Sequence, residues 1–133
     1  MRSPTLALAA VLLASCASAK MTPIADIPKL ASLEEVMDNQ ATASDPQFKK
    51  IGQSQFNDHE LADLARAVDV INATSTKTHD FAKGRPEFDA LATKVNDKSK
   101  ALSAAVTAKD AGGINAALKE MKATCKECHS KFR

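Results

Sequence analysis

Residues 111–133, AGGINAALKEMKATCKECHSKFR, carry the clearest folding signal in this chain. Apolar and sulfur-containing side chains recur along this stretch at steps of four and three residues, at Ile114, Leu118, Met121, Cys125, Cys128 and Phe132. Residues three and four apart share one face of an α-helix, so the pattern predicts an amphipathic helix with a heptad-like seam. A seam of this kind packs against other helices, which favours a helical bundle.

Three more helices are predicted upstream of this segment. The first is expected to begin after Pro28, with Ser32 and Glu35 as a capping box. Its predicted apolar stripe consists of Leu30, Leu33, Met37 and Ala41. Pro46 interrupts the pattern, so we expect a kinked continuation or a restarted helix that carries Phe48, Ile51 and Phe56.

The second and third helices complete the predicted fold. The second is expected to follow the cap residue Asn57 and to fade in the polar run 72–79. The third is expected to begin at Pro86 and to end at the glycine pair 112–113. The sequence has no Trp, no Tyr and no alternating β-branched run, which argues against strands. These segments predict an all-α fold, an antiparallel four-helix bundle whose interior is a usual place for a cofactor.

The predicted last helix contains the sequence Cys125-Lys126-Glu127-Cys128-His129, in which two cysteines and a histidine form a C-x-x-C-H motif. This motif is the attachment signature of a covalently bound c-type haem. Each thiol can add to one vinyl group of the porphyrin, and the adjoining imidazole can reach the iron. Cys125 and Cys128 are therefore the predicted haem thioether residues, and His129 is the predicted proximal iron ligand.

Two other kinds of site use a C-x-x-C pair. A thiol-disulfide redox site places its first cysteine at a helix N-terminus, whereas this pair lies near the C-terminal end of a predicted helix. A structural zinc site normally needs four protein ligands, and only three are clustered here. The remaining histidines and cysteine of the chain are His59, His79 and Cys16. A haem-free bundle with a metal ion or a disulfide at the two thiols stays open as an alternative.

The first 19 residues predict an export signal. Arg2 precedes an unbroken apolar run at residues 6–14, and Ala17-Ser18-Ala19 fits an A-x-A cleavage site. The apolar run is too short for a transmembrane helix, which needs about 20 residues. In the alternative, residues 13–16 form a lipobox, and Cys16 becomes a lipid anchor. We therefore expect a signal peptide at 1–19 and one exported, periplasmic haem-binding domain at 20–133, with a membrane tether only if Cys16 is lipidated.

The charge balance excludes one class of partner. The chain has 18 basic and 16 acidic residues, so it lacks the strongly basic character of a nucleic-acid-binding domain. No paired carboxylates and no nucleophile with its base can be placed in the sequence. A non-enzymatic haem protein is therefore expected, with other redox proteins as its partners.

The C-terminal motif, the export signal and the four helical segments together make the chain resemble the class II c-type cytochromes, the cytochrome c-prime group. The resemblance implies a four-helix bundle with one haem c attached near the C-terminus. An aromatic and a basic residue commonly follow the histidine in that family, which places Phe132 beside the haem and Arg133 near the proximal imidazole. A solvated surface charge is the alternative for Arg133. The resemblance also implies that a homodimer through the first two helices can form.

The family divides by what faces the iron on its distal side. High-spin members block that side with a bulky apolar residue and bind NO or CO, whereas low-spin relatives place a first-helix methionine on the iron. Met37 is accordingly the candidate distal ligand; as a plain core residue, it or Leu33 would be the steric block. His59 and His79 are expected on the surface, and Met121 on the proximal side. An electron carrier is the preferred function, and a gas-binding haem protein is the alternative.

Overall fold

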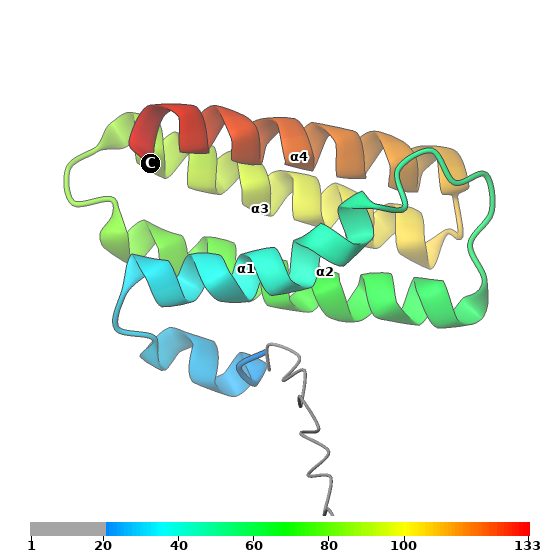
Figure 1. The fold of residues 1–133 in the computed structure, drawn as a ribbon, viewed down its shortest axis with the longest axis horizontal. Coiled ribbons are helices and arrows are strands. Elements are labelled where there is room, and N and C mark those ends of the chain that lie inside the picture. Colours follow the sequence, from blue (N-terminus) through cyan, green and yellow to red (C-terminus); the bar gives the residue numbers. More distant parts are fainter. Residues whose placement is uncertain (1–20) are drawn as a thin grey trace, which may run out of the picture.

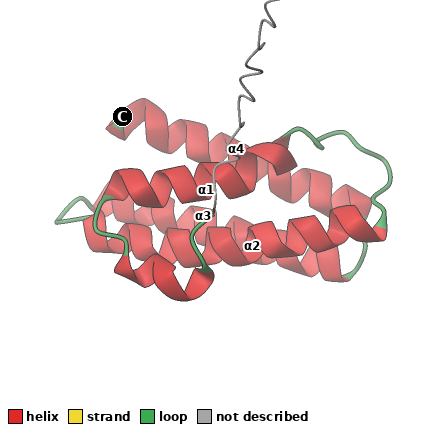
Figure 2. Ribbon diagram, turned by 60° about the horizontal axis from the view of Figure 1, so that its bottom comes forward, coloured by secondary structure: helices red, strands yellow, loops and turns green. Residues whose placement is uncertain are grey.

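The computed structural model of the chain describes residues 21–133, whose main elements are four long helices (Figure 1). Successive helices run in opposite directions and are joined by short connections (Figure 1). The elements in chain order are η1 (Ile24–Lys29), α1 (Leu33–Phe48), α2 (Asp58–Thr78), η2 (His79–Phe81), α3 (Pro86–Thr107) and α4 (Ala111–Phe132). Residues 21–133 contain no strand (Figure 2), so the all-α four-helix prediction is confirmed. The predicted export signal, lipobox and cleavage site fall outside the described residues.

The predicted capping box at the start of α1 is confirmed. The Ser32 hydroxyl accepts a hydrogen bond from the Glu35 backbone N–H at 3.2 Å. In return, the Glu35 carboxylate accepts from the backbone N–H groups of Ala31 at 2.9 Å and Ser32 at 3.1 Å. These hydrogen bonds stabilise the ionised carboxylate and lower the pKa of Glu35. The cap satisfies donors that a helix N-terminus leaves unpaired and so defines where α1 begins.

The body of α1 differs from the prediction in two respects. Pro46 lies within the last turn and α1 continues to Phe48, so the helix does not restart there. The predicted apolar stripe is also not the buried one, because Ala41 is exposed and Met37 is only half-buried. The buried residues of α1 are Val36, Gln40, Ala43, Ser44 and Gln47. Three of these five are polar, so the apolar pattern selected the wrong face of the helix.

The second helix begins as predicted and ends later than predicted. Asn57 and Glu60 form a capping box, with the Asn57 side chain accepting from the Glu60 N–H at 2.9 Å. Instead of fading at 72–79, α2 continues to Thr78. Its last buried residues include Thr74 and Thr78, whose hydroxyls donate to the carbonyls of Val70 and Thr74, each at 2.8 Å. Hydrogen bonds to the preceding turn let these polar side chains lie in the interior, which is why the polar run misled the prediction.

The Asn57 cap allows a stability prediction. Replacing Asn57 with alanine removes the acceptor for the Glu60 N–H and is expected to lower the free energy of unfolding by about 1 kcal/mol. Asn57→Asp retains a capping oxygen and is expected to cost little, so it is the matched control. Chemical denaturation measured by circular dichroism tests both variants. Equal stability of the alanine and aspartate variants would contradict a role for this cap.

The junction between α3 and α4 differs from the prediction as well. Pro86 opens α3 as expected, but α3 ends at Thr107, and the glycine pair 112–113 lies inside the first turn of α4. The turn is made by Lys109, which has a φ of 53°. A Cβ on Gly113 would lie 2.6 Å from an Asp110 carboxylate oxygen and 3.1 Å from the Ala105 Cβ. The second glycine therefore permits a close approach between the two helices instead of ending one of them.

The heptad-like seam of α4 has two parts. Ile114, Leu118 and Met121 are almost completely buried in the core, whereas Cys125, Cys128 and Phe132 are half-buried. Ion pairs tie α4 to α3, among them Lys98 with Glu120 at 2.6 Å. By contrast, α4 touches α1 at only a few positions. The end of the seam that carries the two thiols therefore lies beside a gap in helix packing instead of inside the packed core.

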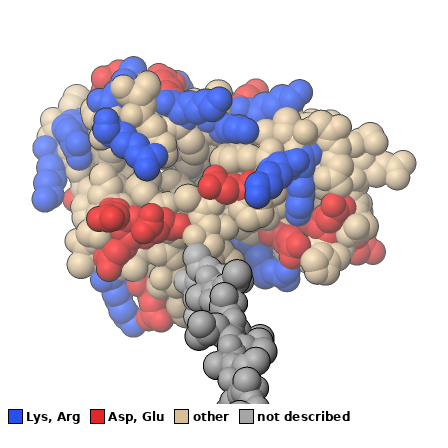
Figure 3. All heavy atoms as spheres, viewed as in Figure 1, with Lys and Arg blue, Asp and Glu red and all other residues tan. Residues whose placement is uncertain are grey.

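The surface of the described part carries charges of both signs. Figure 3 shows basic and acidic side chains interspersed on one face of the bundle. Among residues 21–133, no helix is long and apolar enough to cross a membrane.

Candidate cofactor site

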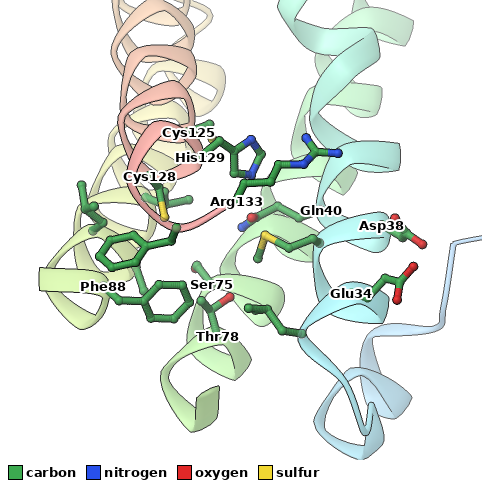
Figure 4. A pocket seen from close by; sticks show the side chains of 16 residues that line it. Glu34, Asp38, Gln40, Ser75, Thr78, Phe88, Cys125, Cys128, His129 and Arg133 are labelled. Carbon is green, nitrogen blue, oxygen red and sulfur yellow. The ribbon is translucent and has the colours of Figure 1, made fainter. Parts of the chain in front are cut away.

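A cavity of about 440 Å³ is lined by side chains from all four helices, at the end of the bundle where α1 begins and α4 ends (Figures 1 and 4). The site residues that the sequence singled out all line it: Met37, Cys125, Cys128, His129, Phe132 and Arg133. Its apolar walls are Leu33, Phe88, Leu91, Ala92 and Val95. A second cavity of about 200 Å³ shares Met37, Gln40, Cys125 and His129 with the first, so the two adjoin.

The two thiols are free and their environment keeps them protonated. Burial, with smaller contributions from the neighbouring Cys128 and Asp45, raises the pKa of Cys125 to about 11. Burial also raises the pKa of Cys128, an effect that the Arg85 charge partly offsets. A thiol-disulfide redox site requires the opposite, a thiolate stabilised at neutral pH. The structure thus supports the sequence argument against that class of site.

Within residues 21–133, no group of three His, Cys, Asp or Glu side chains comes close enough together to hold a metal ion. Cys125, Cys128 and His129 thus line one cavity without converging on a single point.

An aromatic wall closes one side of the cavity. The rings of Phe88 and Phe132 meet edge to face, with 5.4 Å between their centroids. The Arg85 guanidinium lies 4.5 Å from the Phe88 ring centroid and 5.8 Å from that of Phe132. Arg85 is held in place because it donates to the backbone carbonyls of Phe81 at 2.7 Å and Ala82 at 3.1 Å. The sequence predicted a turn at Arg85 and missed this role, which only the fold reveals.

The polar side chains that line the cavity extend in different directions. Figure 4 shows the Arg133 side chain extending from α4 toward α1, beside the imidazole of His129. Glu34 and Asp38 also line the cavity, and Figure 4 shows their carboxyl groups directed away from His129. Gln40 extends from α1 toward α4 (Figure 4). The imidazole therefore has the cationic Arg133 side chain beside it, whereas the neutral Gln40 side chain comes from the other helix, α1.

The other candidate residues lie away from this site. His59 is a surface residue, with 82% of its side chain exposed, as predicted. His79 is only partly exposed, and its Nδ1 lies 2.5 Å from a carboxylate oxygen of Asp89. Met121 is 1% exposed and belongs to the core cluster, outside the lining of both cavities.

The residues around the cavity fit a c-type haem. Cavities of about 300–1,000 Å³ with mostly apolar walls and a few polar groups are typical of cofactor sites. Here two reduced thiols and an imidazole from consecutive turns of α4 line the same cavity as apolar side chains of α1 and α3. The donor set is also right, since it offers two sulfurs for the porphyrin and a nitrogen for the iron.

Fold and site together define a class, the c-type haem proteins built on a four-helix bundle. Residues 72–133 match the family model described as Cytochrome C'. The comparisons with curated proteins and with solved structures gave no match. The matched segment includes α3, α4 and the C-x-x-C-H motif but excludes α1. The match and the C-x-x-C-H motif together indicate a covalently attached haem c.

Proposed function

We propose that this protein is an electron carrier. In this proposal, Cys125 and Cys128 hold the haem by thioether bonds, His129 is the proximal ligand and Met37 is the distal ligand. The observation that carries the proposal is that Met37 on α1 and His129 on α4 line both adjoining cavities from opposite sides. Haem iron ligated by histidine and methionine supplies a one-electron couple with a raised reduction potential.

The other lining residues have supporting roles in this proposal. Phe132 packs beside the haem as part of the aromatic wall with Phe88. Arg133 extends into the cavity region near the proximal imidazole, where its charge favours the reduced, less positive iron (Figure 4). The aliphatic residues of α3 exclude water, which keeps the local dielectric low and strengthens such charge effects.

Binding of a small gas is a second candidate function, which one observation favours. The main cavity extends past Met37 and Gln40 into the smaller one, so a small ligand has space on the α1 side. The family match allows either function, that of an electron carrier or that of a gas-binding haem protein. A visible spectrum of the purified protein separates the two. A low-spin ferrous form unaltered by CO supports the carrier, whereas a high-spin form shifted by CO supports the gas binder.

The Met37 assignment gives a direct prediction. Met37→Ala removes the thioether from the cavity, so the ferrous protein is expected to change from low-spin to CO-reactive. Met121→Leu is the matched control, because Met121 is buried in the core and lines neither cavity. Titration with CO, followed by visible absorption, is the measurement. If Met37→Ala leaves the spectrum and the CO response unchanged, methionine is not the distal ligand.

The proposal extends to the location and partners of the protein. Proteins of this family are generally periplasmic, and removal of residues 1–19 on export fits that location. We propose redox proteins as partners, met through a small interface, and a homodimer as the assembly to test. The intact mass of the mature protein distinguishes cleavage after Ala19 from lipidation at Cys16. A purified chain that still begins at Met1 would contradict the export proposal.

A further inference from the structure

Gln40 is a buried polar residue for which the packing of the bundle gives no reason. It lies on the interior face of α1 and is 9% exposed. No hydrogen bond joins its carboxamide to another group of residues 21–133, and the carboxamide atoms are not fully enclosed, since the enclosed side-chain atom without a partner among those residues is Asn72 Oδ1. It lines both cavities, and Figure 4 shows it extending from α1 toward the helix that carries His129. Because Gln40 borders both cavities, its amide is free to hydrogen-bond to a group held inside them.

Gln47 shows that the same helix face can satisfy a buried glutamine. It lies two turns further along α1 and is 6% exposed, similar to Gln40. Its side-chain oxygen accepts a hydrogen bond from Lys50 Nζ at 2.9 Å, and it lines neither cavity. The two glutamines thus differ in hydrogen bonding according to whether they border a cavity. Where the helix face is packed the amide has a protein partner, and where the face borders the cavity it has none among the described residues.

We propose that Gln40 donates a hydrogen bond from its amide to a small ligand held on the α1 side of the haem, and so determines which ligands are retained there. The inference rests on the haem c site of the proposed function but not on Met37 being a ligand. A carboxamide is neutral and carries two N–H donors, which suits an anionic or polar ligand better than an apolar one. The other α1 residues that line the main cavity offer no N–H donor: Leu33 and Met37 have apolar side chains, and Glu34 and Asp38 carry carboxyl groups.

The geometry also distinguishes Gln40 from Arg133, the other side chain with N–H donors at the main cavity. Arg133 belongs to the same helix as His129 and lies one turn beyond it, so it is placed for the imidazole side of the haem. Gln40 belongs to the opposing helix and lies one turn beyond Met37. Gln40 is thereby assigned to the face of the haem where an added ligand would bind, and Arg133 to the opposite face.

The test compares ligand complexes of the holo-protein in a Met37→Ala background, in which the α1 side is open. CO is the probe for the ferrous form, and its C–O stretching frequency is read by infrared spectroscopy. A donor near the oxygen lowers this frequency, so Gln40→Leu is expected to raise it. Cyanide is the probe for the ferric form, and loss of a hydrogen bond to an anion is expected to weaken its binding about tenfold. Gln47→Leu is the matched control and is expected to change neither value.

The outcomes separate this inference from the proposed function. If Met37→Ala leaves the spectrum unchanged, Met37 is not an iron ligand. The α1 side is then already open in the wild type, and the same measurements compare wild type with Gln40→Leu. An unchanged frequency and an unchanged cyanide affinity in Gln40→Leu overturn the inference in either background. The inference is also overturned if Gln40→Leu melts at a lower temperature but keeps the C–O frequency and the cyanide affinity. The amide would then contact the edge of the haem and not a ligand. Gln40→Glu, which keeps the size but loses the donor when ionised, replaces the leucine variant if that variant does not fold.

Discussion

Replacing both Cys125 and Cys128 with serine is expected to yield a protein without covalently bound haem. A hydroxyl is far less nucleophilic than a thiol toward the porphyrin vinyl groups, so neither linkage forms. Each single serine variant is expected to retain at most one thioether bond and to hold the haem poorly. Because the cofactor binds only the folded chain, the double variant is also expected to unfold at a lower temperature. The lost contacts are those along the cavity between α1 and α4.

The measurement is the mass of the denatured protein after expression with haem-maturation machinery. Wild type is expected to carry the mass of one haem, and the double variant that of the bare chain. Ser130→Ala is the matched control, because Ser130 is exposed, lies two residues from Cys128 and lines neither cavity. Full covalent retention in either single variant would show that the affected thiol is not a linkage. A colourless wild-type protein with the unmodified mass would refute the haem assignment as a whole.

Replacing His129 with alanine is expected to remove the proximal bond while the haem stays covalently attached. The imidazole is the cavity-lining nitrogen ligand contributed by α4, so the iron loses its axial ligand from that helix. The ferrous absorption spectrum is expected to lose its low-spin bands. Both thioether bonds should remain, because the Cys125 and Cys128 side chains are unchanged.

Histidine substitution at a distant site is the control for this prediction. His59→Ala changes an exposed residue near the start of α2, far from the C-x-x-C-H motif in the sequence and outside both cavities. It is expected to leave the ferrous spectrum unchanged. Added imidazole should restore a low-spin spectrum in His129→Ala if the lost group is an axial ligand. An identical spectrum in His129→Ala and wild type would show that another residue binds the iron on the proximal side.

Local signals predicted the starts of α1, α2 and α3 correctly. Ser32 with Glu35, and Asn57 with Glu60, are capping boxes whose hydrogen bonds span three residues, so nearby sequence contains all the information they need. Pro86 at the start of α3 is a signal of the same local kind. The spacing of Cys125, Cys128 and His129 follows from covalent attachment to one cofactor, so it too is readable without the fold.

The predicted ends of the second and third helices were wrong, because a polar run and a glycine pair were interpreted as helix ends. The run at 72–79 is polar, yet Thr74 and Thr78 are buried, because their hydroxyls bond to the carbonyls of the preceding turn. The glycines at 112–113 lie in the first turn of α4, because Gly113 must fit closely against Ala105. Both outcomes depend on which neighbours a residue meets in the bundle, which a local pattern does not specify.

The amino-acid sequence alone determined that this protein is helical and that its last helix carries two thiols and an imidazole for one covalent haem. Periodicity, caps and motif spacing are short-range properties, and they are fully present in the linear chain. Only the tertiary structure determined that α1 packs loosely against α4, leaving a cavity lined by Met37 and Gln40 from α1 and by His129 from α4. That arrangement depends on how four helix faces share a single core, so it is set by side chains far apart in the sequence.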